Sequence, residues 1–303
     1  MNASGQGALL RAMPWVFVLI WSTGFVVARY GMPHAPPMSF LAWRFAFSVL
    51  GLVIWARWAG AHWPATRSQW GHLAVVGVLL HAGYLGGVWA AVKAGMGAGL
   101  VALIVGLQPV LTAVWVSAVD RLGEGRVSLR QWAGLGLGFA GLVMVVWDKL
   151  GVGEAGPVSL ALALWALLAI TAGTLYQKRH VVGGDPRTGN AVQLMAALAI
   201  SAPLAWLEAE PIVLHPHFIG AMAWSVLVLT LGGNSLMYLL IQRGAATSFT
   251  SLLYLVPPCT AVLAWLLFGE TLTALALAGM GIVAWGVWLV VRSQGGSSSQ
   301  PTR

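Results

Sequence analysis

Apolar stretches follow one another along nearly the whole chain, separated by short segments that contain glycine, proline or charged residues. Each stretch is about twenty residues long, which is the length an α-helix needs to cross the hydrocarbon core of a bilayer. The pattern predicts ten transmembrane helices, at 14–31, 37–58, 70–92, 97–119, 129–147, 157–178, 190–208, 217–241, 246–268 and 272–291. We therefore expect an all-α membrane protein.

The composition favours the same class. Hydrophobic residues make up 59% of the 303 residues and charged residues 8%, whereas about a quarter of a soluble domain is charged. The sixteen Lys and Arg residues outnumber the eight Asp and Glu residues, but they lie singly between apolar runs rather than in a basic stripe. We therefore expect contact with membrane lipids and no binding of nucleic acid. No small-residue cleavage site follows the first apolar run, which is interpreted as a retained span.

The distribution of positive charge predicts the orientation. If both termini are cytoplasmic, twelve of the sixteen cationic residues fall on the inner side: Arg11, Arg57, Arg67, Arg121, Arg126, Arg130, Lys178, Arg179, Arg187, Arg243, Arg292 and Arg303. Cytoplasmic loops of membrane proteins carry an excess of Lys and Arg. A multi-pass protein with both termini in the cytoplasm is the prediction.

An internal repeat runs through the chain. Pro258 follows Pro109 by 149 residues, and the same offset pairs further glycines and prolines: Gly24 with Gly173, Pro37 with Pro186, Gly83 with Gly232, and Gly95 with Gly244. Other residues cannot replace the backbone conformations that Gly allows or that Pro imposes, so matches at Gly and Pro indicate duplicated structure. Because each unit has an odd number of spans, the second unit enters the membrane from the opposite side. We predict two inverted five-helix repeats, 1–150 and 151–292, and a disordered cytoplasmic tail, 293–303.

Pro109 and Pro258 stand inside the fourth and ninth apolar runs. A proline within a helix frees a carbonyl one turn earlier and kinks the helix, and in lipid such a carbonyl needs protein or water as a partner. Both positions are therefore predicted to be hinges or to face a cavity. The alternative is that these prolines are simply tolerated, as many are in membrane helices.

Several motifs resemble a known family. They are "WSTGFVVARYG" in the first span, "AWRFAF" in the second, "FGETLT" at 268–273, and the matching "GLGLGFAGLVMV" and "GMGIVAWGVWLV". Together with the repeat, they resemble the EamA-type transporters of the drug/metabolite transporter superfamily, and most of all the YddG-type aromatic amino acid exporters of bacterial inner membranes. "FGET" has no close copy at the end of the fourth span. The resemblance implies a transporter of amino acids or related metabolites in the inner membrane.

Polar side chains deep in a span usually face the protein interior or water, so they are candidates for a substrate path. His81 and Tyr84 share one face of the third span, and the eighth span carries a second polar stripe at the equivalent place. The predicted substrate-binding residues are Trp21, Ser22, His81, Tyr84, Gln108, Thr171, Asn234, Ser235, Tyr238 and Tyr254. Helix packing is the alternative for each, because serine and threonine often bond their own helix backbone.

Two further features leave alternatives open. Arg44, in the body of the second span, needs polar partners because its guanidinium cannot shed its charge. It could bond helix-end carbonyls, snorkel to the interface or attract a substrate carboxylate. His215 and His217 have metal-like spacing, but their loop lacks companion ligands, so neither a metal site nor a cofactor is expected.

The predicted function is export of amino acids, aromatic or other neutral ones, by alternating access. No carboxylate lies at mid-membrane in any predicted span, which favours facilitated diffusion, and His81 is the candidate if protons are coupled. The alternatives are an exporter of other small metabolites or lipophilic drugs and, less expected, an intramembrane enzyme. The sequence shows none of the usual hydrolase, metalloprotease or nucleotide-binding motifs. A monomer is compatible with all of these readings.

Overall fold

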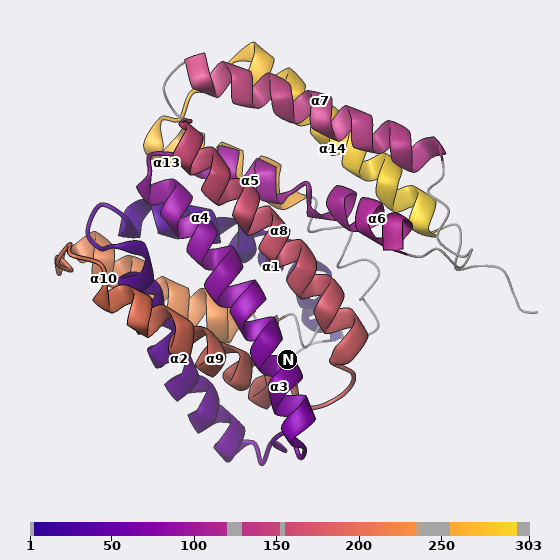
Figure 1. Ribbon diagram of the computed structural model, residues 1–303. Coiled ribbons are helices and arrows are strands. Elements are labelled where there is room, and N and C mark those ends of the chain that lie inside the picture. The colour runs from indigo at the N-terminus through magenta and orange to yellow at the C-terminus, as the bar shows by residue number, and fades with distance from the viewer. Residues whose placement is uncertain (1–2, 120–128, 152–154, 234, 237–254, 296–303) are drawn as a thin grey trace, which may run out of the picture.

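A computed structural model describes residues 3–119, 129–151, 155–233, 235–236 and 255–295. These residues form helices joined by short loops, without a strand among them (Figure 1). The first half contains α1 (Ala3–Gly31), α2 (Pro37–Trp58), α3 (Arg67–Gly77), η1 (Val78–Gly83), α4 (Tyr84–Lys93), α5 (Ala98–Val105), α6 (Gln108–Val119) and α7 (Leu129–Gly151). The second contains α8 (Pro157–His180), α9 (Pro186–Trp206), α10 (Pro216–Ala223), η2 (Trp224–Gly232), α13 (Val256–Phe268) and α14 (Ala274–Gly295).

Helices that correspond in the two halves pack in opposite directions. α7 and α14 lie side by side at the top of Figure 1. A Cβ added at Gly141 would lie 2.5 Å from the Gly279 carbonyl oxygen, and one at Gly286 would lie 2.6 Å from that of Gly134. Because higher numbers in α7 meet lower numbers in α14, the two helices are antiparallel. Small residues allow this close approach.

Other helix contacts also pair the first half with the second. α2 packs on α9 and α5 on α13, each helix on its repeat mate. α4 packs on α8, and correspondingly α1 packs on α10 and η2. This set of contacts is unchanged when the halves are swapped, and with the antiparallel α7 and α14 it is the arrangement of two inverted repeats.

A π-helical segment occurs at the equivalent place in each half. η1 ends at Gly83 and η2 ends at Gly232, the glycines that the 149-residue offset pairs. π-Helical turns are rare and occur frequently at functional sites. His81 lies in η1 and its repeat mate Thr230 lies in η2, so each predicted polar stripe has a residue on irregular helix.

The two repeat-related prolines lie in the first turn of a helix, not in the middle of one. α5 ends at Val105 and α6 begins at Gln108, so the fourth span is interrupted before Pro109, while Pro258 follows the start of α13. A proline is favoured in a first turn, because the N–H that it lacks has no helical partner there. The expected kink inside a continuous helix is therefore a break between two helices at Pro109. Gly106 fits this break against α13, since a Cβ there would lie 2.6 Å from Pro257 Cγ.

Four helical segments of the described residues are long and apolar enough to cross a membrane: Pro37–Trp58, Arg67–Lys93, Pro157–His180 and Pro186–Trp206. Shorter apolar helices include Trp15–Gly31, Ala98–Thr112, Pro216–Gly232, Val256–Phe268 and Ala274–Gly286. Breaks such as the one at Pro109 divide predicted spans into shorter helices. Nine of the ten predicted spans correspond in order to these segments, and the fifth, 129–147, corresponds to α7. Residues 237–254, which include parts of the eighth and ninth spans, lie outside the described residues.

Candidate functional site

A cavity of about 970 Å³ lies between the two repeats. Helices of both halves line it, including η1 and α4 from the first and α8, α9 and η2 from the second. At one end the lining includes the loops at 62–65 and 181–185, which we call the mouth. From there it extends inward to Trp89, to the break before α6 and to the first turn of α13. The volume is in the range of small-molecule binding sites.

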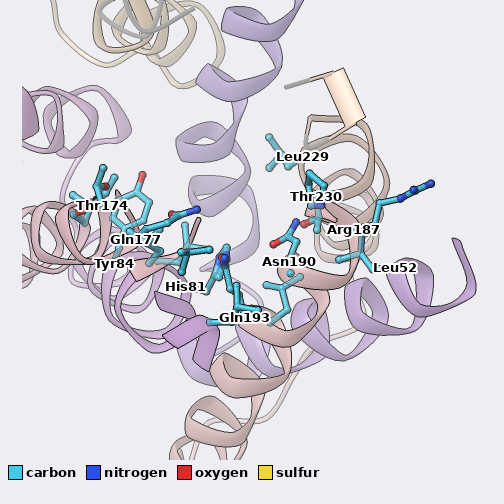
Figure 2. Close-up of a pocket in the computed structure, with 18 of the residues that line it drawn as sticks. Leu52, His81, Tyr84, Thr174, Gln177, Arg187, Asn190, Gln193, Leu229 and Thr230 are labelled. Carbon is cyan, nitrogen blue, oxygen red and sulfur yellow. Dashed lines mark hydrogen bonds between the residues drawn. The ribbon is translucent and has the colours of Figure 1, made fainter. Parts of the chain in front are cut away.

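Polar side chains from both repeats meet in the depth of the cavity. His81 Nε2 lies 3.3 Å from Gln193 Oε1, so the ring of η1 and the amide of α9 form a hydrogen bond. Figure 2 shows these side chains next to each other, with Tyr84 on the η1 side and Asn190 and Thr230 farther along the wall. The Thr230 hydroxyl donates to the Ser225 carbonyl at 2.9 Å within η2.

Arg44 is the only cationic residue in the deep part of the described lining. Its side chain is buried, at 8% exposure, and its Nε has no hydrogen-bond partner among the described residues. The guanidinium lies over the Trp89 ring, 5.9 Å from the ring centroid, and no ion pair joins it to an acidic residue of the described chain. A buried charge without a compensating partner is costly, so a group that arrives with a ligand would be favoured here.

Polar groups continue from the deep part towards the mouth along α8. Gln108 Nε2 donates to Thr174 Oγ1 at 2.9 Å, and Gln177 follows one turn later in the lining (Figure 2). His72 Nδ1 lies 2.9 Å from the Tyr176 hydroxyl nearby. These groups offer donors and acceptors to a solute that moves between the mouth and the deep cluster.

The mouth contains a fixed ion pair. Arg187 donates through Nε and Nη2 to the two carboxylate oxygens of Asp185, at 3.0 and 2.7 Å, and its guanidinium lies 5.6 Å from the Trp55 ring centroid. The side-chain hydrogen bond from Arg187 lowers the pKa of the Asp185 carboxyl, so this group stays ionised at neutral pH. Asp185 is the sole carboxylate in the described lining, and it is already paired.

At the opposite end, which we call the closed end, two carboxylates of the second half bind the starts of helices in the first half. Glu208 accepts the N–H groups of Met38 and Ser39 at the start of α2, at 2.9 and 2.8 Å. Glu270 accepts those of Ala98 and Gly99 at the start of α5, at 2.7 and 3.2 Å. Both carboxylates satisfy N–H groups at a helix N-terminus that lack helical partners. None of these residues lines the cavity.

Glu270→Ala is expected to lower the free energy of unfolding by about 1–3 kcal/mol, because two buried N–H groups lose their acceptor. Thermal unfolding in detergent measures this loss. Glu210→Ala is the matched control, since Glu210 is exposed and pairs with Lys93 at the same end, where a surface ion pair contributes about 0–1 kcal/mol. Equal losses in the two variants would contradict the bridging role of Glu270.

The structure separates the predicted site residues into three groups. Trp21, His81, Tyr84 and Gln108 line the cavity. Ser22, Thr171 and Ser235 lie outside the lining, and their hydroxyls donate to the carbonyls of Val18, Leu167 and Leu231 on their own helices. Asn234, Tyr238 and Tyr254 lie outside the described residues.

Residues of α8 and α9 complete the site beyond those predicted. Gln177, Asn190 and Gln193 line the cavity. A signal for Gln193 was present in the sequence, since the 149-residue offset pairs it with Arg44 and both reach the same cavity. Gln177 and Asn190 had no comparable signal, because they lie near the ends of predicted spans, where polar residues are common.

Two similar all-helical halves with a cavity between them are the class that this architecture defines, and the comparisons with known proteins identify the family. The model of the EamA-like transporter family matches twice, over residues 12–147 and 158–292. The chain therefore belongs to the EamA-like transporter family, in the drug/metabolite transporter superfamily, with two EamA domains. This result confirms the family resemblance seen in the sequence, while the finer resemblance to YddG-type exporters stays a prediction. Members of the family are multi-pass membrane transporters of small solutes rather than enzymes.

One solved structure, described as "Crystal structure of protein", is similar over 92% of this chain and 95% of its own, with a TM-score of 0.59. Its sequence identity is 16%, so the likeness shows the fold alone. No curated protein matches the sequence.

Proposed function

We propose that this transporter exports amino acids, aromatic or other neutral ones, and related carboxylate-bearing metabolites across the bacterial inner membrane. The observation that supports this substrate class best is Arg44, a buried guanidinium without an anionic partner in the described part of the cavity. A guanidinium pairs with a carboxylate through two parallel hydrogen bonds. A substrate carboxylate would supply the charge that the described lining does not.

Aromatic side chains next to Arg44 support an apolar or aromatic substrate side chain. Phe45 lies beside His81 with ring centroids 6.2 Å apart, and Trp89 lies under the guanidinium. Phe17 and Trp21 are stacked at 5.1 Å on the α1 side of the lining. Aromatic faces favour offset-stacked or edge-on contact with another ring. In this proposal the carboxylate binds Arg44 while the substrate side chain packs between the aromatic walls.

The two ends of the cavity support transport by alternating access. By the distribution of positive charge, the mouth faces the cytoplasm and both chain termini lie on that side. The described conformation is then inward-facing, with the outer side closed by Glu208 and Glu270. We propose that the repeats rock about the substrate, with the helix starts at Pro109 and Pro258 as hinges, and that Gly106 allows the movement at Pro257.

Facilitated diffusion is the proposed energetics. Proton-coupled transporters commonly use a carboxylate at mid-membrane, and the described lining contains only Asp185, which is at the mouth and paired with Arg187. The competing proposal is a proton-coupled exporter of other metabolites or lipophilic drugs, with His81 as the proton carrier. The hydrogen bond between His81 and Gln193 is the observation that favours it, since a proton on Nε2 would be held towards an acceptor.

Purified protein in liposomes tests both proposals. Efflux of labelled aromatic amino acids is expected down their concentration gradient, without an imposed proton gradient. Their amides and decarboxylated amines, which lack the carboxylate, should be transported poorly. Accumulation driven by a proton gradient and lost in His81→Ala would support the coupled alternative instead. Equal transport of amino acids and their amines would overturn the assignment of Arg44 to a carboxylate.

A further inference from the structure

Three histidines of the two repeats meet at the closed end. His34 lies in the turn between α1 and α2, and His215 and His217 lie at the start of α10 in the second half. The rings of His34 and His215 are stacked with centroids 4.2 Å apart, and the His217 ring is 4.7 Å from that of His215. One potential ligand nitrogen from each ring lies within 4.8 Å of the other two. His34 is the companion ligand that the sequence around His215 lacks.

Backbone hydrogen bonds fix the two segments that present these rings. The His34 carbonyl accepts the Val213 N–H at 2.8 Å, which joins the turn of the first repeat to the loop of the second. His34 N–H donates to Gly31, and His215 N–H donates to Val213, at 3.0 and 2.8 Å. The backbone that presents these rings is therefore already held in position. A site that is preorganised in this way loses little conformational entropy on binding.

The chemistry of three imidazoles suits a transition metal. Neutral imidazole is a ligand for Zn²⁺, Cu²⁺ and Ni²⁺. In a tetrahedral Zn²⁺ site with Zn–N distances of about 2.0–2.1 Å, the ligand nitrogens are roughly 3.3 Å apart. The nitrogens of the three rings lie within 4.8 Å of one another, so they must approach by at most about 1.5 Å. Burial of its ring, and then the neighbouring imidazoles of His215 and His217, lower the pKa of His34. The rings are partly exposed, so water can take the fourth position.

We propose that His34, His215 and His217 form a binding site for a divalent transition-metal ion, with Zn²⁺ as the reference ion, that bridges the two repeats at the closed end. An ion bound to both repeats holds them together there, since it binds the closed arrangement and loses a ligand when the repeats separate. By linkage, the ion stabilises the conformation with the open mouth. Metal binding therefore inhibits transport, because the closed end must open in every cycle.

One existing hydrogen bond limits the affinity. His215 Nδ1 accepts the His217 N–H at 3.2 Å, an N-cap for α10. A neutral ring that accepts through Nδ1 has its proton on Nε2, so His215 must either change tautomer or exchange this bond for the metal. We expect a dissociation constant in the micromolar range rather than the nanomolar range of structural zinc sites.

Titration of the purified full-length protein with Zn²⁺ tests the site without any assay of transport. One ion per chain is expected to bind in the parent and to raise its unfolding temperature, and His34→Ala and His217→Ala are each expected to weaken binding at least tenfold. His180→Ala, which removes an exposed imidazole near the mouth, is the control and should keep the parental affinity. Parental binding in His34→Ala, or loss of binding in His180→Ala alone, would overturn the proposal.

A second measurement separates binding from a general loss of fold. The metal-free His34→Ala protein should unfold at the parental temperature, and addition of Zn²⁺ should no longer shift it. In liposomes, micromolar Zn²⁺ should inhibit the parent and not His34→Ala, whichever substrate is carried. If the parent binds one Zn²⁺ through these histidines but is not inhibited, the site exists without bridging the repeats, and the inhibitory role is wrong.

Discussion

Arg44→Gln is expected to remove high-affinity binding of carboxylate-bearing substrates. Loss of one partner from a desolvated, hydrogen-bonded charge pair costs about 2–5 kcal/mol, which corresponds to roughly 30-fold or more in affinity. Glutamine preserves much of the length of the side chain and its polarity but not its charge. Binding of amino acids to the detergent-solubilised protein, followed by calorimetry, measures the effect, and transport in liposomes should fall in parallel.

The stability of the same variant distinguishes a binding role from a structural one. Arg44 is buried, and the described residues provide no anionic partner and no acceptor for its Nε. Removing such a charge relieves an uncompensated desolvation cost, so the ligand-free variant should unfold at the parental temperature or above it. A variant that loses binding and also several degrees of stability would instead indicate that Arg44 holds helices together.

Arg44→Lys is the matched comparison. Lysine preserves the positive charge but not the planar fork that binds two carboxylate oxygens at once. An affinity between those of the parent and Arg44→Gln is expected. Parental affinity in both variants would exclude a direct contact between residue 44 and the substrate carboxylate.

The repeat could be predicted from the sequence because it is marked by glycines and prolines, the residues that respond most directly to backbone geometry. Glycines and prolines at a constant offset mark places where backbone geometry repeats, and η1 and η2 end at one such pair. Helical periodicity placed His81 and Tyr84 on one face of the third span, and both line the cavity, from η1 and from the start of α4. The repeat was sufficient to predict these features, because a residue in one half supports the interpretation of its partner in the other half.

The orientation of short polar side chains was not predictable in this way. Ser22 and Thr171 lie deep in apolar spans, but each hydroxyl bonds a carbonyl one turn earlier on its own helix, so neither needs a polar cavity. Gln177 and Asn190 line the cavity from near the ends of predicted spans, where a polar residue gives no signal. The meeting of His34 with His215 depends on how two distant loops pack, which no local pattern encodes.

Gly77→Ala is expected to destabilise the protein and to displace one wall of the cavity. A Cβ added at Gly77 would lie 2.0 Å from the carbonyl oxygen of Gln193, and 2.6 Å from its Cα. These are backbone atoms of α9, so no side-chain rotation relieves the overlap and the helices must separate. Forcing extra atoms into packed structure costs typically about 1–3 kcal/mol, and contact with backbone places this substitution at the upper end or above it. Chemical or thermal unfolding in detergent measures the loss.

Gly71→Ala is the control because it lies on the same helix, α3, where an added Cβ meets no atom within 4 Å. Alanine is favoured over glycine in a helix by about 0.5–1 kcal/mol, so this variant should be as stable as the parent or slightly more stable. Substrate affinity should fall only in Gly77→Ala, because separation of α3 and α9 moves Gln193 away from His81. Equal stability and affinity in Gly77→Ala and Gly71→Ala would contradict the prediction. It would mean that the position of Gln193 in the cavity does not depend on the close packing of α3 on α9.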